Sequence, residues 1–366
     1  MKILYIITQA DGGGAQNYTL ALARHFNGAI AAGSEAGQLF EAAEKNRLAT
    51  FKLEHLKREV SPYHDLMAIW EIRGLLKAYQ PDILHLNSSK AGVLGSFAKI
   101  GLKLKVVFTA HGFVFNEPLP WPVRAFYIAL EKTASDFRDQ IITVSDKDRA
   151  TALNFKLAAA EKITTIRNGL PPLDFLSKEA ATAELNLPVN FFLFATIANF
   201  YKTKGLDMLI EAVSLLKEDL RKKCKFVLFG NGPEENNLKL KIKNLKLEPS
   251  FILLGKQDRA YRFLKAFDAF LLPSLKEGFP YALLEAAQAG LPILATRTGG
   301  VPEALGEQGF YVTPGSPQEL AEKIGQLIND QTLRTKLARQ SQERIGLFTQ
   351  KKMLEETEAV YKKILQ

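Results

Sequence analysis

Two acidic residues, Glu277 and Glu285, flank the start of an expected helix and have the spacing to hold two ends of one ligand. The apolar run 268–272 predicts a buried strand, and residues 281–288 predict a helix that begins just after a proline. Eight helical residues span about 12 Å, so one carboxylate lies at the mouth of the helix and the other two turns along it. Ionised carboxylates only accept hydrogen bonds, which suits a ligand rich in hydroxyl groups.

The backbone at the start of this helix suits the same kind of ligand. The first N–H groups of a helix have no partner within it and lie at the positive end of the helix dipole. Gly278, Phe279 and Tyr281 have such N–H groups and can donate to an oxygen-rich, anionic ligand, whereas Pro280 has no N–H. The alternative, from spacing alone, is that one acid is an ordinary loop residue and the other lies on a solvated helix face.

The elements that position these residues follow a strand–helix alternation, which predicts an α/β fold with two doubly wound parallel sheets. An Asn-Gly pair and a Pro-Pro pair within 168–172 predict a stiff linker between domains 1–170 and 171–350. The predicted strands are Ile3–Ile7, Asp82–Leu86, Lys105–Thr109, Gln140–Val144, Lys162–Ile166, Phe191–Ile197, Phe226–Phe229, Phe251–Leu254 and Asp268–Leu272. Predicted helices run to about Phe26, from about Arg124 to Asp136, over Tyr281–Gln288 and from about Lys351 to Leu365, with N-caps at Ser61, Ser145 and Ser316.

Polar residues follow two strands of the first half directly. Asn87, Ser88 and Lys90 come after one strand, and His111 stands beside a glycine after the next. Open α/β sheets hold ligands at the carboxyl ends of their strands. We therefore expect these side chains to form an acceptor-side site, and His111 to have a functional role.

A glycine-rich turn, with Gly13 and Gly14 at its centre, joins the first strand to the first helix, a place where such folds bring backbone close to phosphate. Dinucleotide binding with Glu35 on the ribose is an alternative, but the pattern lacks the third glycine. Asp146-x-Asp148 could indicate a metal site; a helix capping box starting at Ser145 explains the same residues better. We expect no metal site.

Composition excludes several classes of protein. With 366 residues, 47% hydrophobic and 24% charged, the chain is expected to form two globular domains in the cytoplasm. The single cysteine, Cys224, cannot form an internal disulfide and is expected in the core. The net charge of +9 is spread along the chain, so no nucleic-acid partner is expected, and contact with an anionic membrane surface is a secondary possibility. The lysine-rich series 239–246 reads as a solvated helix face whose buried side is Leu238, Ile242 and Leu245.

The order of motifs in the second half is similar to that of a known family. Pro273-Ser274, Glu277-Gly278-Phe279-Pro280, Leu284-Glu285-Ala286, Ala289-Gly290-Leu291-Pro292 and Gly299-Gly300-Val301-Pro302-Glu303 follow one another within about thirty residues. This order resembles the donor-site signature of the retaining GT-B glycosyltransferases of the family 4, or glycosyl transferases group 1, type. The resemblance implies two Rossmann-like domains facing across a cleft, with the C-terminal helix 351–366 packed back on the first domain.

The resemblance also implies roles for individual residues. Glu285 would bind the ribose hydroxyls and Glu277 the sugar hydroxyls, while Lys204 would neutralise the departing diphosphate and His111 would assist from the first domain. The implied donor-binding set further includes Gly13, Gly14, Gly230, Gly232, Gly255, Gly278, Phe279, Pro280, Tyr281 and Leu284. Asn199 stands where the family usually has arginine, and Lys202 could supply the missing charge from another position.

The implied reaction is metal-independent hexosyl transfer from a UDP- or GDP-linked sugar to a glycan, lipid-linked or small-molecule acceptor. It would proceed with retention by same-face substitution, in which the leaving phosphate takes the acceptor proton, and it needs no cofactor. Cell-surface polysaccharide or glycoconjugate synthesis is the expected setting. A sugar-nucleotide epimerase or hydrolase on the same fold, or a binding protein that has lost turnover, are the alternatives.

Overall fold

The computed structural model describes residues 1–33, 37–117 and 119–366. Glu35, the ribose ligand of the dinucleotide alternative, lies outside the described residues. The chain divides into two compact units, unit 1 with residues Met1–Asn168 and Lys351–Gln366, and unit 2 with residues Gly169–Gln350. The chain thus leaves unit 1 two residues before the expected boundary and returns to it for its last helix.

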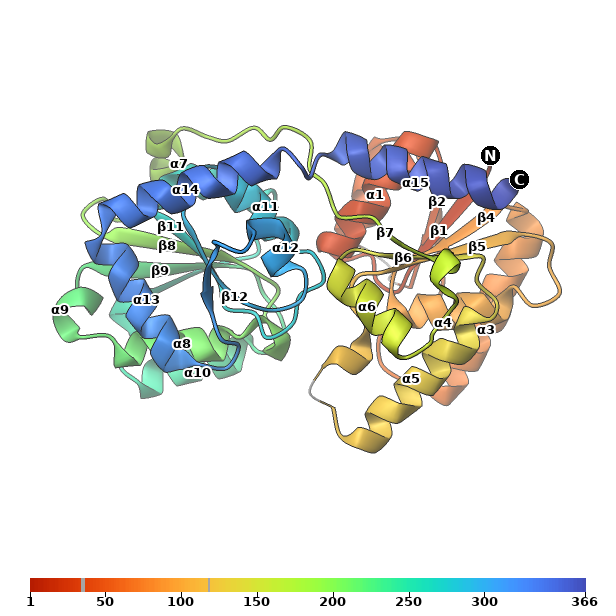
Figure 1. The fold of residues 1–366 in the computed structure, drawn as a ribbon, viewed down its shortest axis with the longest axis horizontal. Helices are drawn as coiled ribbons and strands as arrows, with labels where there is room; N and C mark the ends of the chain where they lie inside the picture. The colour runs from red at the N-terminus through yellow and green to blue at the C-terminus, as the bar shows by residue number, and fades with distance from the viewer. Residues whose placement is uncertain (34–36, 118) are drawn as a thin grey trace. The chain divides into compact units, whose positions relative to one another are not determined.

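Unit 1 is built on a parallel sheet of seven strands in the order β3-β2-β1-β4-β5-β6-β7 (Figure 1). Strand order reverses between β1 and β4, which is the usual ligand position of such sheets. The strands are β1 Ile3–Ile7, β2 Ala29–Ala32, β3 Thr50–Lys52, β4 Ile83–Leu86, β5 Lys105–Ala110, β6 Gln140–Thr143 and β7 Ile163–Thr165. The helices are α1 Gly14–Phe26, α2 Gln38–Lys45, α3 Pro62–Tyr79, α4 Ser89–Ala98, α5 Trp121–Ser135, α6 Asp146–Asn154 and α15 Gln350–Leu365, with short 3-10 turns η1 Val114–Asn116 and η2 Ala160–Lys162.

Unit 2 repeats the plan with a parallel sheet of six strands in the order β10-β9-β8-β11-β12-β13. The strands are β8 Phe192–Ile197, β9 Cys224–Phe229, β10 Phe251–Gly255, β11 Ala269–Leu272, β12 Ile293–Thr296 and β13 Phe310–Val312. The helices are α7 Lys178–Glu184, α8 Leu206–Leu215, α9 Glu218–Arg221, α10 Glu235–Asn244, α11 Tyr281–Gln288, α12 Val301–Leu305, α13 Pro317–Asn329 and α14 Gln331–Ile345; the 3-10 turns are η3 Lys202–Lys204, η4 Glu248–Ser250 and η5 Ala260–Ala266.

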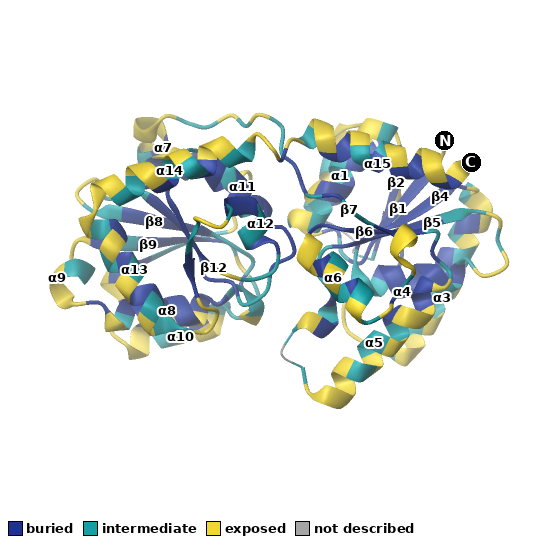
Figure 2. Cartoon of the chain, in the orientation of Figure 1, coloured by how far each residue is buried: buried dark blue, intermediate teal, exposed yellow. Residues whose placement is uncertain are grey.

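Burial explains why these segments form strands. In each unit the sheet is buried between helices whose outward faces are exposed (Figure 2), and β1, β2, β4 and β11 are buried at every position. Sheets covered on both faces need continuous apolar runs rather than alternation. The predicted α/β, doubly wound fold with two parallel sheets is therefore confirmed, and β1 and α11 begin and end at the predicted residues.

The differences from prediction lie mostly at element ends. β9 begins at Cys224, whose thiol is buried, and burial raises its pKa to about 12, so it is inert. α5 begins at Trp121, three residues before the predicted start. Leu245 was predicted to be buried but is 41% exposed; Leu247 lies in the core instead, because α10 ends at Asn244 and the chain then turns.

The predicted capping residues behave differently from one another. Ser145 accepts from the Asp148 N–H over 3.1 Å, which is the serine half of the predicted capping box, and its hydroxyl donates to Asp148 Oδ2 over 2.8 Å. Ser61 and Ser316 are the N-cap residues of α3 and α13, as predicted, but their side chains form no cap hydrogen bond. Glu319 instead accepts from the Thr313 N–H over 2.8 Å, in the loop before α13.

Candidate functional site

Glu277 is the buried charge of unit 2. Its side chain is 6% exposed and accepts at Oε1 from Nζ of Lys204 over 2.7 Å. The Ser274 hydroxyl donates to the same oxygen over 2.6 Å. Burying a carboxylate costs several kcal/mol unless it is paired and hydrogen-bonded. Both donors bind Oε1, which leaves Oε2 as an acceptor for a ligand hydroxyl.

Two threonines after β12 hold the loop that carries Glu277. The Thr296 hydroxyl donates to the Ser274 carbonyl, and the Thr298 hydroxyl donates to the Leu275 carbonyl. Thr296 is fully buried. The loop backbone is thus fixed on both sides of its acid.

The turn that follows packs against Glu277 itself. Gly300 donates its N–H to the Gly278 carbonyl over 2.7 Å. Gly299 has φ +52°, and a Cβ at this position would lie 1.7 Å from the Glu277 carbonyl oxygen. Only glycine provides both the conformation and the space.

Lys204 is brought to Glu277 by a second tight contact. Gly205, which ends η3, has φ +62°, and a Cβ there would lie 2.1 Å from the Pro273 carbonyl oxygen. The Leu275 N–H donates to the Thr203 carbonyl over 2.8 Å. The loops after β8 and β11 therefore place the lysine and the acid together.

The predicted glycines after β9 and β10 support the next loop. Gly230 donates its N–H to the Gly255 carbonyl over 2.8 Å, and a Cβ on Gly230 would lie 1.8 Å from the carbonyl preceding Asn199. A Cβ on Gly232 would lie 2.7 Å from the Phe200 carbonyl oxygen. These glycines thus fix the backbone beside Asn199, and a direct role in ligand binding remains a prediction.

Glu285 differs from Glu277 in that no ion pair joins it to a cation among the described residues. Desolvation by the surrounding protein raises the pKa of its carboxyl to about 7. It lies one turn before the end of α11, on a helix whose other neighbours are mostly buried. A carboxyl held in this way gains from hydroxyl donors that a ligand supplies.

The remaining predicted residues of this segment contribute little side-chain surface. Phe279, 3% exposed, packs edge-on against Phe348 at 5.0 Å, and Tyr281 is 8% exposed. Pro280 is buried at the N-cap of α11. Leu284 is 1% exposed and lies in the core, and its donor contact remains a prediction.

In unit 1, His111 and Asn87 follow neighbouring strands. His111 packs edge-on against Tyr18, with ring centroids 4.8 Å apart, and burial lowers its pKa to about 4. Asn87 donates from Nδ2 to the His85 carbonyl over 3.1 Å. His111 Nε2 and Asn87 Oδ1 are buried and have no hydrogen-bond partner in the described structure. Buried polar atoms are almost always paired, so these two are candidates for ligand or water contact.

The other predicted residues of unit 1 have structural partners or are exposed. The Ser88 hydroxyl accepts from the Thr8 N–H over 3.1 Å, and Lys90 forms an ion pair with Asp65 at 2.5 Å. These contacts occupy both acceptor-side candidates. Gly13 is the N-cap of α1, and Gly14 is exposed at its first turn.

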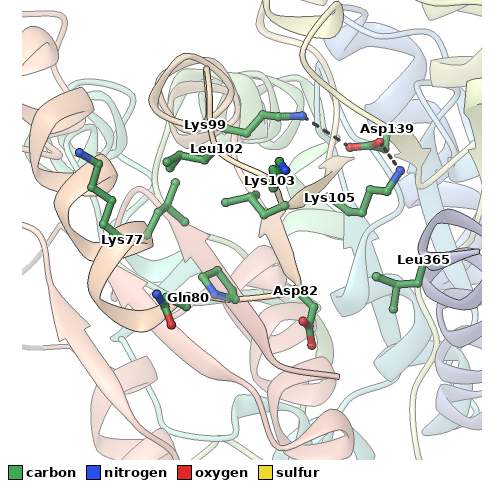
Figure 3. A pocket seen from close by; sticks show the side chains of 12 residues that line it. Lys77, Gln80, Asp82, Lys99, Leu102, Lys103, Lys105, Asp139 and Leu365 are labelled. Carbon is green, nitrogen blue, oxygen red and sulfur yellow. Dashed lines mark hydrogen bonds and ion pairs between the residues drawn. The ribbon is translucent and has the colours of Figure 1, made fainter.

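A hollow of about 900 Å³ in unit 1 lies at the opposite edge of the sheet from these residues. Its charged side chains include Lys77, Lys99, Lys105 and Asp139, and two of the lysines bind Asp139. Figure 3 shows that the Lys77 ammonium points away from those of Lys99 and Lys105. The hollow is therefore not a site where several lysines converge on one anion.

Two further observations concern metal ligands and membrane spans. Among residues 1–33, 37–117 and 119–366, no group of three or more His, Cys, Asp or Glu side chains has the arrangement to hold a metal ion. No helix in the described parts of the chain has the length and apolar composition to cross a bilayer.

Comparison with known proteins decides the family. Residues 12–172 match the family model Glycosyltransferase Family 4, and residues 177–344 match the model Glycosyl transferases group 1. The chain is 30% identical over 273 residues to the UDP-Gal:alpha-D-GlcNAc-diphosphoundecaprenol alpha-1,3-galactosyltransferase of Escherichia coli, covering 73% of this chain and 70% of that protein. This chain belongs to the family 4, group 1 glycosyltransferases.

Other relatives agree with this assignment. The glycosyltransferase is 27% identical over 321 residues to the N-acetyl-alpha-D-glucosaminyl L-malate synthase of Bacillus anthracis, covering 83% of this chain and 81% of that protein. The crystal structure of HepE from Anabaena in complex with UDP-glucose matches with a TM-score of 0.85 at 21% identity, covering 99% of this chain and 100% of that chain. The fold is GT-B, with two Rossmann-like domains, as predicted.

Sequence reasoning missed several residues that complete the sites. Ser274 was quoted as part of a motif without a role, and its position directly after a strand was the available signal. Thr296, Tyr18 and Thr109 gave no signal, because their partners are distant in the chain. His85 is fully buried within β4, and its partners are likewise distant in the chain.

We expect Gly299→Ala to lower donor turnover at least tenfold, because the new methyl group must displace the Glu277 backbone. Gly315→Ala is the matched control: Gly315 also has positive φ, at +81°, but a Cβ there meets nothing within 4 Å. Both variants carry the same kind of backbone strain, of about 1 kcal/mol. Steady-state kinetics and thermal melts compare them, and equal activities would contradict the positioning of Glu277 by this turn.

We expect Glu285→Gln to stabilise the unliganded protein at pH 8 and to weaken donor binding. A pKa raised in the folded state means that stability is highest when the carboxyl is protonated and falls as pH rises from the unfolded value of about 4.5 towards 7. The variant should gain roughly 1–3 kcal/mol at pH 8 and nothing near pH 4.5. Denaturant unfolding at both pH values measures the change in the free energy of unfolding, and Glu322→Gln, at an exposed position, is the control. Equal gains in stability at both pH values would contradict the raised pKa of Glu285.

Proposed function

We propose that this glycosyltransferase moves a sugar from a nucleoside-diphosphate sugar, best a UDP-linked one, to a glycan, lipid-linked or small-molecule acceptor. Transfer occurs with retention and without a metal or other cofactor, in cell-surface polysaccharide or glycoconjugate synthesis. Several relatives are named for polysaccharide synthesis, among them a capsular polysaccharide biosynthesis glycosyltransferase of Staphylococcus aureus. The Escherichia coli relative is named for UDP-Gal, and HepE is described with UDP and with UDP-glucose.

The contact that carries the proposal is the ion pair of Lys204 and Glu277 beside the N-terminus of α11. It places a cation and an acceptor within one small volume, as a sugar diphosphate requires. Glu277 accepts from sugar hydroxyls through Oε2, and Glu285 accepts from the ribose about two turns away. The N–H groups at the start of α11 face the diphosphate.

The chemistry follows from where charge develops. As the glycosidic bond breaks, negative charge grows on the leaving diphosphate, and Lys204 stabilises it there. The leaving phosphate takes the acceptor proton on the same face, so no enzymic base is required. His111 is neutral at physiological pH because of its lowered pKa, so it acts as a hydrogen-bonding group and not as a cation.

Lys204→Ala is expected to lower kcat by about 10²-fold or more while donor affinity changes only a few-fold, since charge on the diphosphate is largest in the transition state. Glu285→Ala should do the reverse and weaken donor binding sharply. Initial rates with saturating acceptor and calorimetric titration with UDP separate the two effects. Small and equal effects of both substitutions would contradict the site.

Lys202→Ala tests whether Lys202 supplies the positive charge that the family usually has as an arginine at the position of Asn199. Lys202 is exposed in the same 3-10 turn as Lys204. A loss of kcat in this variant would assign the charge to Lys202, whereas unchanged kcat would leave Lys204 as the cation of this turn.

Donor and reaction type are tested together. A panel of UDP- and GDP-sugars is screened for thermal stabilisation, because a ligand that binds only the folded state raises its stability. The stabilising donor is then incubated with and without candidate acceptors. UDP release that depends on acceptor supports transfer; release without acceptor indicates a hydrolase, conversion of the sugar without release an epimerase, and binding alone a protein without turnover.

We also propose that unit 1 contacts the anionic inner face of the cell membrane. Large apolar side chains are exposed on and near two of its helices, α3 and α5: Val60, Tyr63, Leu66, Trp70, Trp121, Val123 and Phe126. On α5 the exposed charges are Arg124 and Lys132, while the only acid of this helix, Glu131, is buried and paired. An apolar surface with basic neighbours suits an anionic bilayer interface.

Trp121→Ser with Phe126→Ser should reduce flotation with phosphatidylglycerol vesicles several-fold, because both side chains are more than half exposed on α5. The double variant Val189→Ser and Leu240→Ser removes equally exposed apolar groups from unit 2 and is the control. Flotation with phosphatidylcholine vesicles, which carry no net charge, shows how much of the membrane binding is electrostatic. Equal flotation of both double variants would refute the proposed surface.

A further inference from the structure

A chain of hydrogen bonds runs through the interior of unit 1 and connects the C-terminal helix to the strand that ends at His111. Tyr361 of α15 and Thr109 of β5 both bind the His85 imidazole, at Nδ1 over 2.5 Å and at Nε2 over 2.7 Å. Thr109 in turn bonds the Tyr18 hydroxyl over 3.3 Å. All four side chains are essentially inaccessible to solvent.

The donors and acceptors of this chain fit only one arrangement of protons. The Tyr361 hydroxyl donates to the Tyr5 hydroxyl over 3.3 Å, so towards His85 it must accept. His85 therefore carries its proton on Nδ1, and its Nε2 accepts from Thr109. The Thr109 oxygen is then left to accept from Tyr18. His85, Tyr361, Thr109 and Tyr18 thus each donate once within the network.

The side chains of this hydrogen-bonded network carry no charge. Burial lowers the pKa of His85 to about 3, with His111 adding to the effect. Burial also raises the pKa of Tyr18 to about 12, although a hydrogen bond with Thr357 opposes the rise. Thr357 belongs to α15, so this helix touches Tyr18 as well as His85. A neutral, fully satisfied buried network fixes side-chain positions without the cost of a buried ion.

The chain of hydrogen bonds ends at Tyr18, whose ring packs against His111. The ring of Tyr18 meets the ring of His111 edge-on, with centroids 4.8 Å apart and planes at 78°. His111 Nε2 has no hydrogen-bond partner in the described structure, so packing against Tyr18 is a main restraint on its ring. Whatever fixes Tyr18 therefore fixes the direction in which Nε2 points.

We infer that Tyr361 is a positioning residue: through His85, Thr109 and Tyr18 it holds the His111 imidazole in the orientation used in sugar transfer. The inference rests on the proposed role of His111. The helix α15, which carries Tyr361, begins at Gln350, the last residue of unit 2.

Tyr361→Phe removes the acceptor of the His85 Nδ1 proton and retains the ring. We expect kcat to fall five- to twentyfold, with donor KM within twofold, because donor binding lies in unit 2. Tyr5→Phe is the matched control: it removes a hydroxyl from an equally buried tyrosine of the same cluster, on the side of Tyr361 away from Thr109. We expect it to keep kcat within twofold while costing similar thermal stability.

Imidazole ¹⁵N NMR spectra of the full-length protein supply the readout that loss of stability alone would not change. The wild type should show His85 protonated at Nδ1, and the His111 resonances should shift in Tyr361→Phe but not in Tyr5→Phe. Equal kcat losses in the two variants, or unshifted His111 resonances in Tyr361→Phe, would overturn the inference.

His111→Ala separates this inference from the proposed function. If this variant retains full kcat, the proposed role of His111 fails, and the positioning role of Tyr361 in transfer falls with it. If His111→Ala loses activity but Tyr361→Phe behaves as Tyr5→Phe does, the role of His111 stands and only the positioning inference fails.

Discussion

The buried carboxylate of Glu277 and its bond to Lys204 are the interaction on which the donor-side structure depends. An acid that is 6% exposed is tolerated only with partners, and here a lysine and a serine hydroxyl share one of its oxygens. The pair is strong enough to hold two loops together. It still leaves the second carboxylate oxygen, and part of the lysine's hydrogen-bonding capacity, for a substrate that carries both hydroxyls and phosphates.

Close backbone approach is the constraint that brings these charges together. Gly205, Gly230 and Gly299 each have positive φ, and a Cβ at each would lie within about 2 Å of a neighbouring carbonyl oxygen. The loops after β8, β9, β11 and β12 consequently pack at one edge of the sheet with little freedom. A rigid edge of this kind preorganises charges for a transition state, which is more effective than flexible side chains that must be ordered during reaction.

The two units handle buried polar groups by opposite means. Unit 2 buries an ionised acid and pairs it with a cation, which suits the recognition of a charged diphosphate. Unit 1 buries His85, Tyr18 and Tyr361 in neutral form, and these side chains are linked by hydrogen bonds to one another or through Thr109. The neutral network gives orientation without attracting a counter-ion, and it ends at His111, whose Nε2 and neighbouring Asn87 Oδ1 are unpaired.

The sequence by itself determined the fold class, the family, and the segment that holds the two candidate acids, because these depend on local patterns: apolar strands, a proline-started helix and a dense run of motifs. Tertiary structure alone decided that Leu284 is core, that Ser274 orients Glu277, that desolvation raises the Glu285 pKa, and that Tyr361 reaches His85 from 276 positions away. Burial and desolvation are sums over neighbours that are distant in the chain, and no local pattern of residues contains that information.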